Sequence, residues 1–234
     1  MGAEQLLRQL LRGSDRSASA EAARKLLALP RSPLRLGDAE LCRAVWRLGR
    51  LPKEPEDADG SGWVGPLLRR LQGQVAPRSC RDCGDVAWAF ARQRLLQEEV
   101  LLRLMRTYQR CQPGDPVSLA NLLWAVASAR AAAATAPAAA WPVEPLLKAH
   151  GPVLRAAQGA ELARILWALG SLRVVHSVFH RCTELGEAKT QDLANVVWAL
   201  SRVRWPLPSE LLRRLEAAEL ALPELVATLS ALAE

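Results

Sequence analysis

Two cysteines, Cys80 and Cys83, stand in a CxxC arrangement, the spacing with which thiolates bind zinc or form a redox pair. A zinc site needs four converging ligands, usually as two short pairs, and no second CxxC follows. The compact histidine pair, His176 and His180, lies about 90 residues further along the chain. We therefore expect no metal site, and we expect Cys83 to pack in a hydrophobic core.

The usual motifs of catalysis and cofactor binding are missing. Neither GxGxxG nor GxxxxGK[ST] occurs, so no phosphate-binding glycine loop is expected. The GxSxG nucleophile elbow is absent too, and His150 has no plausible nucleophile near it in sequence. We expect no enzyme, no cofactor and no small-molecule substrate.

Tryptophan recurs in a pattern that could do a different kind of chemistry. Five segments align on it without gaps: ELCRAVWRLGR (40–50), DCGDVAWAFAR (82–92), SLANLLWAVAS (118–128), ELARILWALGS (161–171) and DLANVVWALSR (192–202). A sixth, ELVATLSALAE (224–234), fits the frame with Ser230 in the tryptophan position. The chain stops inside this repeat, which suggests a fragment or a truncated gene model.

Helical periodicity divides each segment into two faces. Counted from the tryptophan as position 0, positions −5, −2, −1 and +2 are mostly apolar and predict the core side. Positions −3, 0 and +4 share the opposite face. Position −3 is always polar and holds Arg43, Asp85, Asn121, Arg164 and Asn195; position +4 holds Arg50, Arg92, Ser128, Ser171 and Arg202.

This face has two interpretations. The planar side chains at position −3 could contact successive bases of a single strand, or they could be solvated or lie between repeats. The tryptophans could stack on unpaired bases, or they could fill the seams between repeats. Small residues that follow the tryptophans, such as Ala125, Ala168 and Ala199, favour tight helix packing and therefore the seam.

A second, weaker helix with a basic residue follows each tryptophan segment. These basic residues are Arg69, Arg103, Lys148, His180 and Arg213. They could follow a phosphate backbone, or they could form a solvated helix face. Together with the residues at positions −3 and +4, they complete the set of candidate RNA-binding residues.

Loop lengths support a helix–turn–helix repeat. From each basic residue to the next tryptophan position the step is 19, 21, 19, 18 and 17 residues, while the opposite step varies between 13 and 24. Insertions therefore collect in one loop of the unit, as surface loops tolerate. We predict an all-α fold, an α-solenoid of about five repeats: a degenerate helical pair as a cap over 1–30, five repeats over 38–222 and a truncated sixth over 223–234.

Composition limits the environment and the partners. The net charge of +7, mostly from arginine, indicates a polyanionic partner. Five cysteines without dense spacing favour a reducing compartment. No run of 18 apolar residues occurs, so no membrane partner is expected, and the N-terminal residues resemble neither a signal peptide nor a typical transit peptide.

The segments SLANLLWAVAS, ELARILWALGS and DLANVVWALSR resemble the repeat signature of the octotricopeptide-repeat family, which is related to FAST-kinase-like proteins. The resemblance covers roughly residues 38–234, although the tryptophan spacings of 42, 36, 43 and 31 are irregular for that family. It implies single-stranded RNA binding in a mitochondrion or chloroplast, acting on RNA processing, stability or translation, with protein partners in an RNA-processing complex. The alternative is a protein-interaction scaffold of the same shape.

Overall fold

The structure, a computed structural model, describes residues 3–12, 16–28, 37–51, 62–111, 114–132 and 141–217. These residues form helices, turns and connecting segments, and no strand occurs among them. The predicted all-α fold is thereby confirmed. The segment expected as a sixth repeat, 223–234, lies outside the described residues.

The tryptophan segments each lie in a helix, and we call these five the A helices. They are α3 (Asp38–Arg50), α5 (Cys80–Arg92), α7 (Pro116–Ala132), α10 (Gly159–Leu172) and α11 (Thr190–Arg202). The elements that follow them are called the B elements. They are α4 (Val64–Gln72), α6 (Glu98–Arg110), α8 (Val143–Ala149), α9 (Gly151–Ala156), η2 (Ser177–Arg181) and α12 (Ser209–Ala217).

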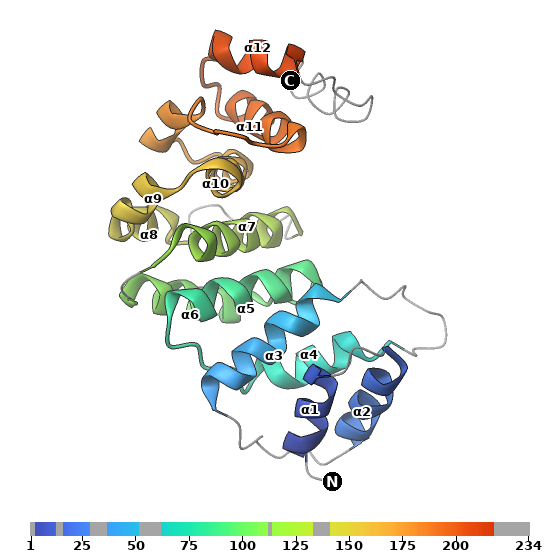
Figure 1. Ribbon diagram of the computed structural model, residues 1–234. Coiled ribbons are helices and arrows are strands. Elements are labelled where there is room, and N and C mark those ends of the chain that lie inside the picture. Colours follow the sequence, from blue (N-terminus) through green and yellow to red (C-terminus); the bar gives the residue numbers. More distant parts are fainter. Residues whose placement is uncertain are drawn as a thin grey trace.

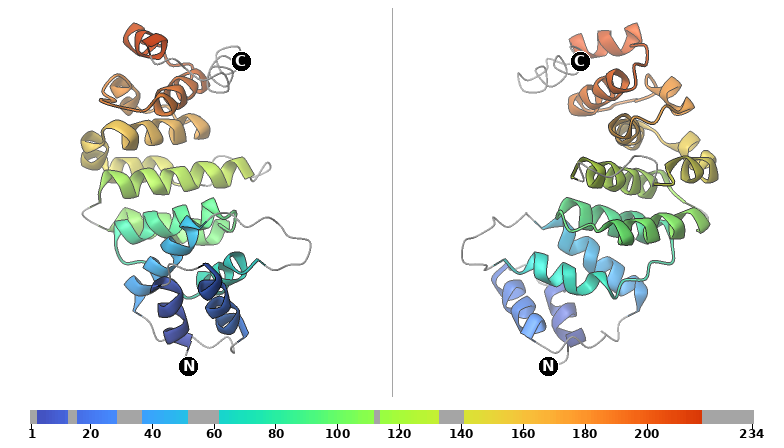
Figure 2. Two further views of the ribbon diagram at one scale, coloured as in Figure 1. Left: turned by 45° about the vertical axis from the view of Figure 1, so that its right-hand side comes forward. Right: turned by 180° about the vertical axis from the view of Figure 1, so that it is seen from behind.

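Successive A helices pack against one another in chain order, α3 on α5, α5 on α7, α7 on α10 and α10 on α11. In the middle of the molecule α6, α8 and α9 lie along one side of this stack (Figures 1 and 2). At the N-terminal end α1 (Ala3–Arg12) packs on α2 (Arg16–Ala28), and the pair contacts α3 and α4. Each A helix in the interior of the stack therefore has an A helix on both sides.

The core lies on the side of the A helices that faces the B elements. In α11, Val196, Val197 and Leu200 are fully buried and Leu193 nearly so, which confirms the expected apolar side. The same positions of the other A helices are buried as well. Fully burying one such large apolar side chain contributes roughly 1.5–3 kcal/mol, so this repeated side is, together with the buried side chains of the B elements, a main source of stability in each unit.

Small residues let neighbouring A helices approach closely. A Cβ atom added to Gly49 would lie 2.4 Å from Ala89 Cβ, and one added to Gly170 would lie 2.6 Å from Ala199 Cα. Glycine inside a helix costs roughly 0.5–1 kcal/mol relative to alanine. Here it allows a helix contact that no side chain would permit, and the small residue after the tryptophan completes it.

Side chains of one repeat also satisfy the last carbonyl groups of a neighbouring A helix. Gln93, just after α5, donates to the carbonyl oxygens of Gly49 and Leu51 at 3.3 and 3.1 Å. Arg130 in α7 donates to Leu172 O at 2.8 Å, at the end of α10. The C-terminal turn of a helix leaves such carbonyls without an intrahelical partner. These bonds therefore fix the ends of adjacent helices relative to each other.

The B elements depart from the expected single α-helix in two repeats. In the third, α8 ends at Ala149 and a separate helix, α9, begins with Gly151 and Pro152, where proline suits a first turn. In the fourth, the element is a short 3-10 helix, η2. The His176 side chain accepts from the Val178 amide at 3.1 Å and caps it. The fourth repeat has the shortest connection after its A helix, only 13 residues from tryptophan to basic residue.

None of the helices in the described part of the chain is long and apolar enough to cross a membrane.

Candidate nucleic-acid interface

The five tryptophans of the A helices are partly buried, and we call Trp46, Trp88, Trp124, Trp167 and Trp198 the tryptophan row. Four of them, all but Trp46, pack against the core through part of the ring. The row lies on the side of each helix opposite its apolar side, as the helical period predicts. Four of the rings therefore contribute to the packing of the repeats, and all five remain partly exposed.

Arginine covers three rings of the row. The guanidinium carbon of Arg50 lies 4.9 Å from the centroid of Trp46, that of Arg92 lies 5.2 Å from Trp88, and that of Arg202 lies 5.7 Å from Trp198. Each pair is four residues apart, one turn along its helix. A cation over an indole face at an exposed site contributes about 0.5–1 kcal/mol. These contacts place a permanent positive charge beside an aromatic face in three of the five repeats.

The other two tryptophans have serine at the corresponding position. Ser128 follows Trp124 and Ser171 follows Trp167, and the Ser171 hydroxyl donates to Trp167 O at 2.9 Å. Trp167 also stacks with Trp198, with ring centroids 6.1 Å apart and planes 26° from parallel. The row therefore contains two kinds of position, one covered by arginine and one not.

The residues at position −3 of the middle repeats bond to each other. Asn121 Nδ2 donates to Asp85 Oδ1 at 3.3 Å, and Arg164 donates to Asn121 Oδ1 at 3.0 Å. Asn121 is only 7% exposed. We call these three residues the polar chain. It joins α5, α7 and α10, so the planar groups at these positions are partners of one another across the repeat boundaries.

The two remaining residues at position −3 stay within their own helices. Arg43 is exposed and donates to Ala39 O at 3.4 Å. Asn195 accepts from Gln191 at 3.2 Å. The polar chain thus spans the middle of the stack and stops at both ends. Sequence periodicity puts these residues on one face, but it contains no information on which helices meet there.

Asp85 is the strained member of the polar chain. Burial raises the pKa of its carboxyl, while Arg81, 3.9 Å away, and the bond from Asn121 act in the opposite direction. A carboxyl whose pKa is raised on folding stabilises the native state only below its unfolded pKa, and that benefit is lost as the pH rises through the folded pKa. As the pH rises through the folded pKa, the charge on the half-buried Asp85 carboxyl therefore lowers the stability of the fold.

We expect Asp85→Asn to leave the free energy of unfolding at pH 7 unchanged or slightly higher, because the amide oxygen can still accept from Asn121. Asn121→Leu is expected to lower it by about 1–3 kcal/mol, since Asp85 and Arg164 both lose a partner. Urea unfolding of the two variants at pH 7 and at about pH 4 measures this. Equal losses for both variants at pH 7 would contradict the role given to the carboxylate.

The basic residues of the B elements lie apart from the tryptophan row. Their side chains are all exposed: Arg69, Arg103, Lys148, His180 and Arg213. Arg213 forms an ion pair with Glu210 at 2.6 Å, and His180 packs edge-on against Trp205 at 4.8 Å between centroids. Neither of these two contacts joins a basic residue of a B element to the tryptophan row.

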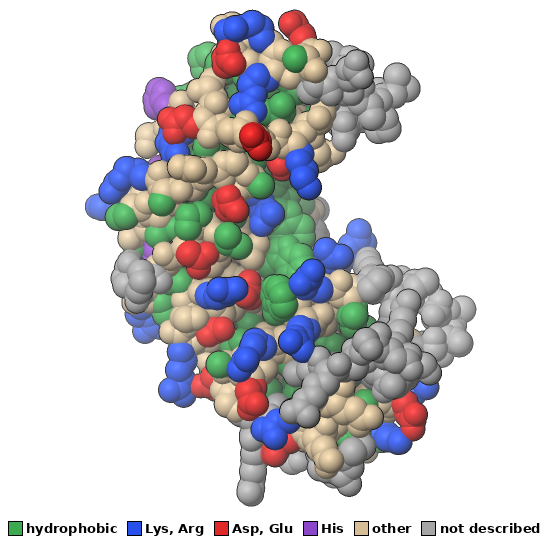
Figure 3. Space-filling view, in the orientation of Figure 1, with side chains coloured by type: hydrophobic (Ala, Val, Ile, Leu, Met, Phe, Trp, Pro, Cys, Tyr) green, Lys and Arg blue, Asp and Glu red, His purple; other side chains and the backbone are tan. Residues whose placement is uncertain are grey.

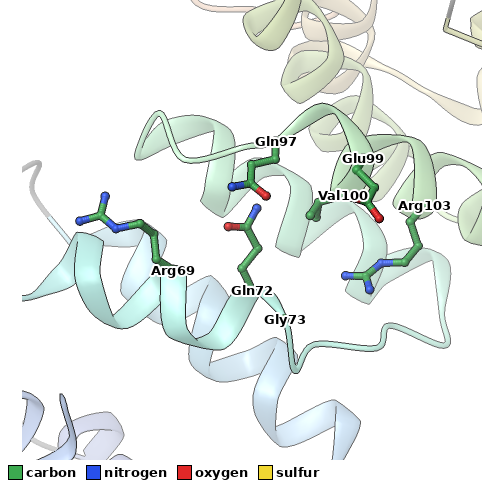
Figure 4. A pocket seen from close by; sticks show the side chains of 7 residues that line it. All are labelled: Arg69, Gln72, Gly73, Gln97, Glu99, Val100 and Arg103. Carbon is green, nitrogen blue, oxygen red and sulfur yellow. The ribbon is translucent and has the colours of Figure 1, made fainter. Parts of the chain in front are cut away.

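Two of these basic residues share a pocket of about 330 Å³ between α4 and α6. Gln72 and Gln97 face each other across it, and Arg69 and Arg103 lie toward its two ends (Figure 4). Glu99 also lines it, and Arg103 donates to Val75 O at 3.4 Å. The glutamines were not singled out by the sequence, because isolated amides in a helix and a loop form no pattern.

On the face drawn in Figure 3, the surface is hollowed beside helices α7 and α10. Hydrophobic side chains gather in it, and lysine and arginine side chains stand around its edge. An apolar floor with a basic edge suits a ligand that combines flat rings with negative charge.

The cysteines and the buried histidine belong to the packing. Cys83 is fully buried, as expected, and Cys80 Sγ donates to Cys111 O at 3.1 Å; burial raises the pKa of Cys80 to about 11. His150 is fully buried against Tyr108, with a bond of 3.1 Å to Tyr108 O, and burial lowers its pKa. No cluster of three or more potential metal ligands occurs among the described residues.

Comparison with known proteins adds no relative: no family model matches the chain, and no curated protein matches it significantly. The resemblance to octotricopeptide repeats rests on the repeated tryptophan segments alone.

Proposed function

We propose that the protein binds single-stranded RNA along the exposed face of its A helices. The observation that carries this proposal is the row of partly exposed indoles, one in each A helix, with an arginine one helical turn away in Trp46–Arg50, Trp88–Arg92 and Trp198–Arg202. Aromatic stacking contributes about 1–3 kcal/mol per unpaired base, and arginine contacts both base faces and phosphates.

The single-stranded form follows from the chemistry of this face. In a duplex both faces of a base are covered by its neighbours, so an indole can stack only on a base that is unpaired and turned outward. One base per A helix sets an upper limit of about five stacked bases on this face. The net charge of +7 favours a phosphate-bearing strand over a neutral or basic peptide for electrostatic reasons.

The setting of this activity is proposed from the resemblance of the repeats. We propose from it that the protein acts in a mitochondrion or chloroplast, on RNA processing, stability or translation. The polar chain does not favour reading of bases by position −3 in the middle repeats, because Asp85, Asn121 and Arg164 already bond to each other. We therefore propose stacking and charge, more than hydrogen bonding, as the source of affinity.

The test is fluorescence anisotropy with a labelled, mixed-sequence single-stranded RNA, over about 50 to 300 mM salt. Duplex DNA of the same length and heparin serve as controls for charge alone. We expect the RNA to bind more tightly than both controls, with an affinity that falls as salt rises. Equal binding to heparin, or no RNA binding at low salt, would reject the proposal and favour a scaffold that holds an extended peptide in the apolar hollow.

A further inference from the structure

The residue at position +4, one turn after each tryptophan, differs between the middle and the ends of the stack. In the first, second and fifth repeats, an arginine at position +4 lies 4.9–5.7 Å from the ring centroid. In the third and fourth repeats the residue at that position is Ser128 or Ser171, too short to reach across an indole face. Over the described residues, no arginine or lysine lies above Trp124 or Trp167.

An arginine over a ring changes what that ring can bind. The guanidinium occupies the face on which a base would stack, so a base must displace it and lose its interaction with the indole. A ring beside a serine has no cation in that place, although one face of Trp167 already stacks on Trp198, so a base would use its other face. Trp124 and Trp167 belong to α7 and α10, which border the hollow with the apolar floor in Figure 3.

The arginines of the tryptophan row lie on either side of Trp124 and Trp167 along the stack. Arg50 and Arg92 lie on the N-terminal side of the uncovered pair of tryptophans, and Arg202 lies on its C-terminal side. The indole holds each guanidinium in place, and the side chains of Arg50 and Arg92 are exposed, so their N–H groups can reach a phosphate bidentately.

We infer that the face divides the two tasks of strand binding. Unpaired bases stack on Trp124 and Trp167 in the middle repeats, and Arg50, Arg92 and Arg202 contact phosphates on either side. This inference rests on the proposed function, since it assigns positions within the same RNA-binding face. The ligand it defines is a single strand with at least two accessible bases and phosphates extending beyond them in both directions.

Ser128→Arg and Ser171→Arg test this division directly. They give the third and fourth repeats the arginine that three other repeats already have, and each adds a positive charge. If phosphate attraction alone determines binding, the added charges strengthen it. If bases stack on Trp124 and Trp167, the added guanidinium groups compete with them and weaken it.

The measurement compares a labelled mixed-sequence RNA with an abasic strand of the same length and charge, at fixed salt. We expect the double variant Ser128→Arg/Ser171→Arg to lose at least about tenfold in affinity for the RNA, as loss of stacking at two positions implies. Its affinity for the abasic strand is expected to be unchanged or higher. Ala156→Arg, at an exposed position of α9, adds charge away from the row and should not lower RNA affinity.

A second variant guards against a folding defect. Trp124→Leu keeps an apolar side chain against the core but offers no flat ring, and we expect it to lower RNA affinity without changing abasic-strand affinity. Tighter RNA binding by the double serine variant, together with unchanged binding by Trp124→Leu, would overturn the division of tasks while leaving RNA binding intact. Failure of the wild-type chain to bind RNA would overturn both proposals.

Discussion

Gly170→Val is expected to lower the free energy of unfolding by about 3 kcal/mol, the upper range for overfilling a packed contact. Even a Cβ atom at Gly170 would lie 2.6 Å from both Cα and Cβ of Ala199 and 3.0 Å from Ala199 O. Much of that surface is backbone, so it cannot move aside as a side chain does. Helices α10 and α11 would have to separate. Urea unfolding followed by circular dichroism measures the change.

The matched control is Gly65→Ala in α4. The nearest atoms to an added Cβ there are the guanidinium nitrogens of Arg69, at 3.8 Å, which is ordinary contact. Removing a helical glycine at such a site stabilises a protein by about 0.4–1 kcal/mol. If Gly170→Val unfolded at the same urea concentration as the wild type, α10 and α11 would not be in the close contact described above.

Replacing Arg50, Arg92 and Arg202 together with glutamine is expected to weaken RNA binding at least about tenfold at low salt. Each phosphate contact to a single strand contributes roughly 0.7 to the slope of log affinity against log salt. Loss of three contacts should therefore reduce the magnitude of that slope by about 2. Glutamine is uncharged and shorter than arginine, so the change removes both the charge and the guanidinium–indole contact. The measurement is a salt titration by anisotropy.

The control removes the same charge from the B elements: Arg69, Arg103 and Arg213 to glutamine. It separates the two sets of basic residues that the sequence left as equal candidates. We expect a smaller loss of affinity and a nearly unchanged slope. An equal loss for both triple variants would mean that phosphates contact the B elements as strongly as the A helices, and the proposed path of the strand would be wrong.

Periodicity was enough to predict the A helices and their buried side. The pattern around Trp198 places Val196, Val197 and Leu200 on one side of a helix, and these residues are buried. This prediction succeeded because both the tryptophan and the apolar positions repeat in every unit. A pattern shared by five segments does not arise by chance as easily as a pattern in one segment.

The B elements were harder, because their signal is a short apolar run without a fixed partner. SVFHRC was predicted as a helix like the others, but Ser177–Arg181 is a 3-10 helix. Helix α9 was not predicted at all, although Pro152 after Gly151 is a signal for a helix start. Local packing against an A helix decides the length of these elements. The sequence of a B element alone does not predict that packing.

The polar chain could not have been predicted from one sequence. Asp85 and Asn121 are 36 residues apart, and Asn121 and Arg164 are 43 apart. The spacing differs between the two bonds because the intervening loops differ. By contrast, the three tryptophan–arginine pairs could have been predicted, since a separation of four residues on a helix brings such side chains together.

The stack of A helices also has a mechanical consequence. Successive repeats make their main contacts through these helices, whose small residues allow little sliding or stretching. The B elements vary in length, down to the five residues of η2, and pack mostly beside their own repeat. We therefore expect the stack to resist stretching along the line of the A helices and to bend more easily. We expect the bending to concentrate at the fourth repeat, so that the hollow can widen or narrow to follow the curvature of its ligand.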